Sequence, residues 1–145
     1  MNINLRRAMI SDAKPIYELC RSELGYDFSL EQVEANVRRL IGDPTNLLLV
    51  AERQNELAGF VHANSHEPVY APKMKSVLAL VVREEYRKHG LGHALINAVE
   101  NWALETGASG VRLNSGETMN DALHFYKSMG YDYIRTQYNF RKMLK

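Results

Sequence analysis

The most constraining feature of the chain is the stretch Val77–Ala103, in which an apolar segment is joined to an amphipathic segment through two glycines. The residues Val77–Val82 are all apolar, which predicts a short buried strand. From Leu91 onward, apolar residues recur at offsets 0, 3, 4, 7, 8, 11 and 12, which predicts one helix with a continuous apolar stripe. The sequence therefore predicts a strand, a short charged loop and a long helix in direct succession.

The loop between this strand and this helix has the composition of an anion-binding site. Arg87, Lys88 and His89 supply charged or hydrogen-bonding side chains, and the glycines at 90 and 92 let the backbone approach a ligand closely. The N-terminus of the following helix directs N–H groups and the positive end of its dipole toward the same loop. Together, these features favour phosphate binding.

Two familiar phosphate-binding patterns do not fit these glycines. A P-loop requires Lys followed by Ser or Thr, and no such pair follows Gly92. A dinucleotide fingerprint requires a third glycine where this chain has Leu95. The pattern that does fit is R-x-x-G-x-G, formed by Arg87, Gly90 and Gly92. The alternative is a surface turn whose basic residues bind nothing.

Length and composition predict one globular domain that spans residues 1–145. Of the 145 residues, 46% are hydrophobic and 24% are charged, and the net charge is +1, which gives no reason to expect nucleic-acid binding. The apolar runs are too short to span a bilayer, and the N-terminus lacks the apolar segment of a signal peptide. The single Cys20 has no companion for a disulfide or a metal site. We therefore expect a cytoplasmic protein without a bound metal, a nucleic acid or a membrane.

The remaining elements follow from apolar spacing and from turn residues. The further strands are expected at Ile3–Ala8, Asn46–Arg53, Leu57–Ala63, Val111–Asn114, Tyr131–Tyr133 and Tyr138–Leu144. The helices are expected from Asp12, as N-cap, to Gly25, from Leu30 to Ile41 after a Ser29/Gln32 capping box, from Leu91 to Thr106, and around Ala122–Met129. The order is β-α-α-β-β-β-α-β-α-β-β, which predicts a mixed α/β sheet with helices on both faces.

The glycine pattern and the element order resemble those of the GNAT superfamily of N-acetyltransferases. The last predicted helix carries a second pattern of that family, N-x-x-A-x-x-x-Y-x-x-x-G-[FY]. This chain matches it at Ala122, Tyr126, Gly130 and Tyr131. The position of the family's asparagine holds Met119, and Asn120 follows one residue later, so that Asn120 is the candidate substitute.

The resemblance implies a GNAT-type fold, α/β (α+β), with a mixed, mostly antiparallel central sheet and helices on both faces. It also implies acetyl-CoA as co-substrate, held by backbone groups of the glycine turn and of the preceding strand. The residues that it implies in cofactor binding are Leu80, Val81, Val82, Arg87, Lys88, His89, Gly90, Leu91, Gly92, His93, Asn120 and Tyr126. Members of the family are often dimers, which makes a homodimer possible here.

The resemblance further implies transfer of the acetyl group to a primary amine by direct attack on the thioester. The attacking amine must be neutral, and an amine with a pKa of roughly 10.4 needs about 4.6 kcal/mol to lose its proton at pH 7. Tyr126 matches the family tyrosine that protonates the leaving thiolate, although an ordinary core tyrosine fits the same position. The position of the glutamate that serves some members as general base holds Ser76, which cannot take that role.

The general base and the acceptor stay open on the sequence alone. His62, His66, Glu67 and Glu117 lie in suitable regions, but each also fits a solvated position, and a water chain is an equal alternative. Carboxylates that could bind a polycationic acceptor are few and scattered. We therefore expect a small amine as acceptor, with a non-catalytic acyl-CoA-binding module or a protein lysine or N-terminal acetyltransferase as alternatives.

Overall fold

The computed structural model describes residues 2–116 and 120–145, and the side chain of Asn120 lies outside the description. The chain divides into two units, Met1–Leu113 and Asn114–Lys145. Within the described residues, no helix is both long enough and apolar enough to cross a membrane.

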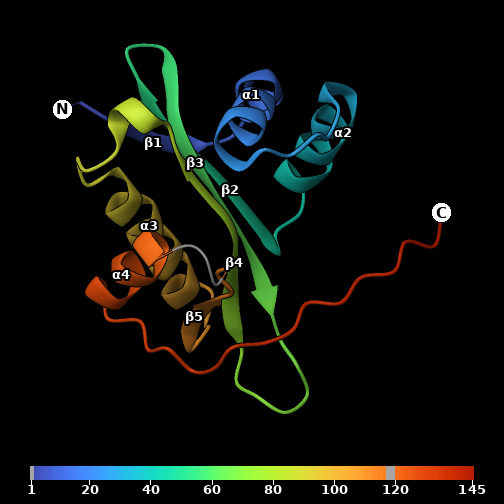
Figure 1. Cartoon of the computed structure of the whole chain (residues 1–145), viewed down its shortest axis with the longest axis vertical. Helices are drawn as coiled ribbons and strands as arrows, with labels where there is room; N and C mark the ends of the chain where they lie inside the picture. The colour runs from blue at the N-terminus through green and yellow to red at the C-terminus, as the bar shows by residue number, and fades with distance from the viewer. Residues whose placement is uncertain (1, 117–119) are drawn as a thin grey trace. The chain divides into compact units, whose positions relative to one another are not determined.

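The described part of the first unit is a five-stranded sheet in the order β1-β2-β3-β4-β5, with helices on both faces (Figure 1). The strands are β1 (Asn4–Arg7), β2 (Asn46–Arg53), β3 (Glu56–His66), β4 (Met74–Val82) and β5 (Gly110–Leu113). The helices are α1 (Ala13–Leu24), α2 (Leu30–Ile41) and α3 (Leu91–Glu105), with 3-10 turns at Ile10–Asp12 and Glu84–Tyr86. Neighbouring strands are antiparallel except β4 and β5, which are parallel. This arrangement confirms the predicted fold class.

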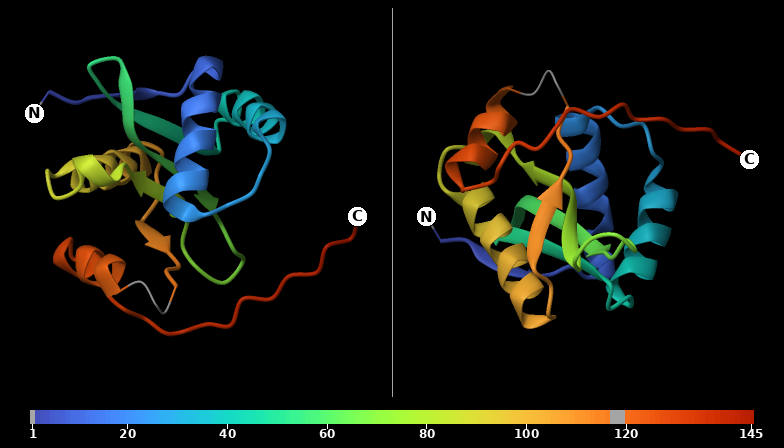
Figure 2. Two further views of the ribbon diagram at one scale, coloured as in Figure 1. Left: turned by 45° about the horizontal axis from the view of Figure 1, so that its top comes forward. Right: turned by 90° about the horizontal axis from the view of Figure 1, so that it is seen from below.

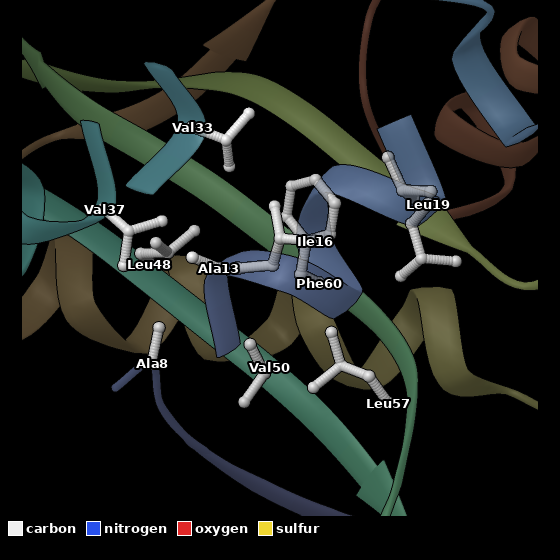
Figure 3. Close-up of a cluster of buried hydrophobic side chains, with 11 residues drawn as sticks. Ala8, Ala13, Ile16, Leu19, Val33, Val37, Leu48, Val50, Leu57 and Phe60 are labelled. Carbon is white, nitrogen blue, oxygen red and sulfur yellow. The ribbon is translucent and has the colours of Figure 1, made fainter. Parts of the chain in front are cut away.

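Helices α1 and α2 cover one face of the sheet through a cluster of buried apolar side chains (Figure 3). The cluster includes Ile16, Leu19, Val33, Val37, Leu48, Val50, Phe60 and Val81, and the partly buried Ala79 packs against it. Leu19 and Val50 have no exposed surface, at 0% each. Helix α2 begins with the predicted capping box, in which the Gln32 N–H donates to the Ser29 hydroxyl at 3.1 Å. The apolar stripes of both helices therefore face the sheet, as their spacing predicts.

Helix α3 packs on the opposite face, as the two views of Figure 2 show. The larger side chains of its predicted stripe are buried, Ala94 and Ala98 are half-buried, and Trp102 is a core residue with 7% of its surface exposed. The Nζ of Lys75, on β4, lies 4.0 Å from the centre of the Trp102 ring and donates to the Ser65 hydroxyl at 3.0 Å. A cation–π contact and a hydrogen bond therefore compensate the burial of this charge.

The hairpin of β3 and β4 is longer than the sequence predicts. β3 continues to His66 and β4 begins at Met74, whereas the predicted strands end at Ala63 and begin at Val77. The added residues are largely polar and pair across the two strands. Because the strands are predicted from apolar runs, the prediction leaves out these polar ends. His66 is consequently a strand residue beyond the predicted end at Ala63, and His62 lies within the strand as predicted.

Asp12 precedes α1 as expected, but its carboxylate binds an arginine instead of capping the helix. Both terminal nitrogens of Arg6 donate to it, at 2.8 and 2.9 Å, and the Met9 N–H donates at 2.7 Å. Burial alone would raise the pKa of Asp12, but the hydrogen bonds from Arg6 and Met9 hold it below its ordinary value. This ion pair therefore fastens β1 to the turn before α1.

We expect Asp12→Ala to lower the free energy of unfolding by about 2 kcal/mol, because it leaves the Arg6 guanidinium with only part of its partners. The loss stays below the usual range for a buried pair since Arg6 keeps Glu52, at 3.2 Å, and some contact with solvent. The stabilisation in the wild type is present above pH of about 4 and is lost as the pH falls further. Urea unfolding at several pH values measures both effects, and an equal effect of Glu34→Ala on the exposed side of α2 would contradict them.

The second unit contains α4 (Asn120–Ser128) and an extended C-terminal segment. Edge-to-face contacts place the Tyr126 ring against the rings of Phe125 and Tyr131, with centroids 5.0 and 5.7 Å apart. The prediction of strands at Tyr131–Tyr133 and Tyr138–Leu144 is wrong, and residues 131–145 contain no strand. A strand needs a hydrogen-bonded neighbour, and the other described element of this unit is a helix, which offers no edge for pairing.

Candidate active site

The glycine turn that is predicted to bind phosphate leads directly into helix α3, whose N-terminus has no side-chain cap. Gly90 is the N-cap of α3, and its φ of +83° is a left-handed conformation that glycine adopts without strain. The first intrahelical bond joins the Ala94 N–H to the Gly90 carbonyl at 3.0 Å, and no described side chain caps the helix. The N–H groups of Leu91 and Gly92 therefore lack an intrahelical acceptor and can bind an anion.

The guanidinium of Arg87 is already engaged within the protein. Its Nε donates to the Val82 carbonyl at 3.1 Å, and its Nη2 forms an ion pair with the Glu23 carboxylate on α1. Arg87 therefore fastens the turn to α1 and to the end of β4. Lys88 and His89 are exposed in the same loop, so they are the side chains best suited to meet an anion directly.

Strand β4 presents an open backbone edge immediately before this turn. Strand β5 pairs with β4 only between Met74 and Val77, so the second half of β4 has no strand on that side in the described chain. On the other side, the Arg83 N–H donates to the Ala58 carbonyl at 2.8 Å, which fixes the alternation of the antiparallel ladder. Leu80 therefore directs its N–H and C=O groups away from β3, toward the open side.

Val82, two residues along the strand, shares this orientation, and its carbonyl accepts from Arg87. Val81 has the opposite orientation. Its backbone groups face β3, and its side chain, 2% exposed, belongs to the cluster under α1 and α2. The open half of β4, the turn and the start of α3 thus follow one another without interruption, while Val81 has no group directed toward them.

The remaining predicted site residues are His93 on α3 and Asn120 and Tyr126 on α4. His93 is exposed in the first turn of α3. Asn120 is the first residue of α4, whereas its side chain and Met119 lie outside the described residues. Burial raises the pKa of Tyr126 to about 12, so the hydroxyl keeps its proton at neutral pH. Tyr126 is therefore suited to donate a proton and unsuited to accept one.

Ser76, at the position of the missing glutamate, is buried and tied to an arginine. Its side chain is on β4, has 6% exposed surface and accepts a hydrogen bond from Arg112 Nη1 at 2.9 Å. A hydroxyl bound to a cation cannot take a proton from an amine. The position expected for a general base is thus filled by a neutral group next to a positive charge.

Sequence reasoning left the role of His62 open and did not single out Asn46. The Nε2 of His62 lies 2.9 Å from the Asn46 Oδ1, on the face of the sheet that α1 and α2 cover. The two residues are 16 positions apart and meet only because Leu48 pairs with His62 and Asn46 with Asn64. No local pattern in the sequence signals that register.

Comparisons with known proteins identify the family of this chain. The model of the Acetyltransferase (GNAT) family matches residues 12–131. An uncharacterised N-acetyltransferase of Chlorobaculum tepidum is 28% identical over 137 residues, which cover 92% of this chain and 78% of that protein.

Solved structures show the same fold at low sequence identity. The aminoglycoside N-acetyltransferase AAC(6')-Iy in complex with CoA matches with a TM-score of 0.88 at 14% identity, over 97% of this chain and 95% of that chain. Glucosamine-6-phosphate N-acetyltransferase from Arabidopsis thaliana matches with a TM-score of 0.82 at 17% identity, over 100% of both chains. Because the family match spans most of its length, the chain belongs to the GNAT family of acetyltransferases and is an acyltransferase.

Proposed function

We propose that this chain transfers an acetyl group from acetyl-CoA to a primary amine of a small molecule. The observation that carries the proposal is the uninterrupted succession of the open half of β4, the glycine turn and the uncapped N-terminus of α3. An extended pantetheine arm needs backbone partners along a line, and a pyrophosphate needs N–H groups at the end of that line. Both requirements are met within Leu80–Gly92. The complex of AAC(6')-Iy with CoA supports the same co-substrate.

In this proposal, each group of the site has one task. The N–H of Leu80 donates to the thioester carbonyl, where negative charge develops as the amine attacks. The N–H groups of Leu91 and Gly92, with Lys88 and His89, hold the phosphates. Tyr126 gives its proton to the leaving thiolate, and Asn120 takes the place of the family asparagine.

The scarcity of carboxylates supports a small acceptor with one amine over a polycationic one. Near His62, Asp43 reaches the ring through Asn46, and Arg112 and Arg39 contribute positive groups on the same face. A polyamine or an aminoglycoside carries several positive charges and is best held by several carboxylates. An acceptor that carries one amine together with a neutral or anionic group fits such a surface better.

The test is a turnover assay with acetyl-CoA and four kinds of acceptor: an aminoglycoside, spermidine, glucosamine 6-phosphate and a peptide with a free N-terminus and a lysine. Release of free thiol gives the rate, and mass spectrometry identifies the acetylated product. We expect transfer to glucosamine 6-phosphate to exceed transfer to spermidine and to the aminoglycoside. Acetylation of the peptide alone would favour the protein acetyltransferase. Tight acetyl-CoA binding without transfer to any acceptor would favour the non-catalytic module.

The proposal also includes a cytoplasmic location and a possible homodimer. The location is the expectation from composition, and the dimer is what the family resemblance implies. Light scattering of the purified protein measures the mass in solution, and fractionation of cells measures the location.

A further inference from the structure

Three polar side chains form a hydrogen-bonded chain on the α1/α2 face of the sheet. The Asn46 Nδ2 donates to the Asp43 Oδ2 at 3.0 Å, and the Asn46 Oδ1 lies 2.9 Å from the His62 Nε2. The other oxygen of Asp43 accepts from the N–H and the hydroxyl of Thr45, at 2.9 and 2.7 Å. The carboxylate is therefore fixed in place, and it fixes the amide in turn.

This chain determines which nitrogen of His62 carries a proton. An ionised carboxylate only accepts hydrogen bonds, so the group of Asn46 that faces Asp43 must be the NH₂ group. The group that faces His62 is then the carbonyl oxygen, which also only accepts. The Nε2 of His62 must consequently carry the proton, and Nδ1 of the neutral ring is left with its lone pair.

The position of His62 places that ring next to β4, on the face that α1 and α2 cover. His62 pairs across the strands with Ala79, the residue before Leu80, and Asn64 pairs with Ser76. Because alternate residues of one strand share a face, and paired residues do too, His62 lies on the same face as Ser76. His62 therefore belongs to the strand beside β4 and to the face that holds the position where the resemblance implies a general base.

The surroundings keep the ring neutral. Burial, and secondarily the positive charge of Arg39, lower the pKa of His62 below its ordinary value. Other titratable groups on this face include Tyr17 and Cys20 on α1, Asp43 in the loop before β2, His66 on β3 and Arg112 on β5. A half-buried, neutral imidazole with an oriented lone pair has the properties of a general base.

We propose that His62 is the general base of the transfer, with Asn46 and Asp43 as positioning residues. This inference rests on the proposed function. The acceptor enters as an ammonium, and Nδ1 takes one of its protons. The neutral nitrogen attacks the thioester carbon, the C–N bond forms and the C–S bond breaks. The second proton of the nitrogen goes to the leaving thiolate, and the imidazolium returns its proton to water.

His62→Gln separates a base from a structural residue. The glutamine NH₂ can still donate to the Asn46 Oδ1, but it cannot accept a proton at neutral pH. We expect kcat/KM for the best acceptor of the panel to fall about 100-fold, with unchanged acetyl-CoA affinity. His66→Gln, four residues along the same strand, is the matched control and should stay at the wild-type rate. A wild-type rate for His62→Gln, or an equal loss for His66→Gln, would overturn the assignment.

Asn46→Leu tests the positioning role through the pH profile. Loss of the acceptor at Nε2 removes a hydrogen bond that stabilises the imidazolium more than the neutral ring, so the acid limb of kcat/KM should move to lower pH, whereas a merely structural residue would leave it in place. Nitrogen NMR of histidine-labelled wild-type protein gives a readout without turnover. A proton on Nδ1, or a charged His62 ring at pH 7, would refute the inference even if the acetyltransferase is active. Failure of the wild type on every acceptor would instead refute the proposed function, and the base role with it.

Discussion

Gly92→Glu is expected to weaken acetyl-CoA binding at least 100-fold while leaving the protein as stable as the wild type. The variant places a negative charge in the first turn of α3, where the phosphates of the proposed ligand meet the N–H groups of Leu91 and Gly92. The glutamate carboxylate repels the phosphates, and the larger side chain occupies the space that the pyrophosphate needs. A 100-fold change in affinity corresponds to about 2.7 kcal/mol. A glutamate in the first helical turn favours the helix dipole, so unfolding does not explain the loss.

The matched control is Asn97→Glu, which adds the same charge on the exposed side of the same helix, beyond its first turn. Calorimetric titration with acetyl-CoA measures all three proteins, and thermal unfolding checks their stability. Equal binding by Gly92→Glu and the wild type would show that the glycine turn is no phosphate site. Arg87→Glu is a poorer test, because it would also set two carboxylates against each other at Glu23.

Tyr126→Phe is expected to reduce kcat 100-fold to 1,000-fold without changing the affinity for acetyl-CoA. The hydroxyl keeps its proton at neutral pH, since burial raises the pKa of Tyr126 to about 12. Phenylalanine removes that proton but preserves the ring contacts with Phe125 and Tyr131, so the fold of this unit should persist.

Tyr133→Phe provides the control for this substitution, because the Tyr133 side chain is largely exposed, at 60%. Steady-state rates at saturating acetyl-CoA compare the three proteins. If Tyr126→Phe turns over as fast as the wild type, the tyrosine is a core residue and the thiolate obtains its proton from water.

The parts of the fold that the sequence predicts are those with local causes. Helix α3 follows from its own apolar stripe, and the hairpin of β2 and β3 follows from the polar turn at Gln54 and Asn55, both of which have a positive φ. The longer ends of β3 and β4 depend on cross-strand pairs such as Lys75 with Ser65, which no local pattern reveals. The C-terminal residues have the alternation of a strand but lack a neighbouring edge within their unit.

The candidate site divides in the same way. The open turn at Gly90 could be predicted because the strand, the glycines and the helix stripe are consecutive. The contact of Asn46 with His62 depends on the register of two strands, and the partner of Arg87, Glu23, is 64 residues away on another element. Composition and local spacing do not predict contacts between residues that are far apart in the sequence. For this reason, the sequence alone leaves the general base open.

The ties made by Arg87 bear on the thermodynamics of ligand capture. A loop that is free in the absence of ligand loses conformational entropy when it closes around a phosphate, and this loss reduces the affinity. Here Arg87 joins the turn to α1 through Glu23 and to β4 through the Val82 carbonyl before any ligand arrives. The turn is therefore preorganised. In the proposed complex, little free energy is spent on ordering the backbone, so the contacts with the phosphates contribute almost fully to the affinity for acetyl-CoA.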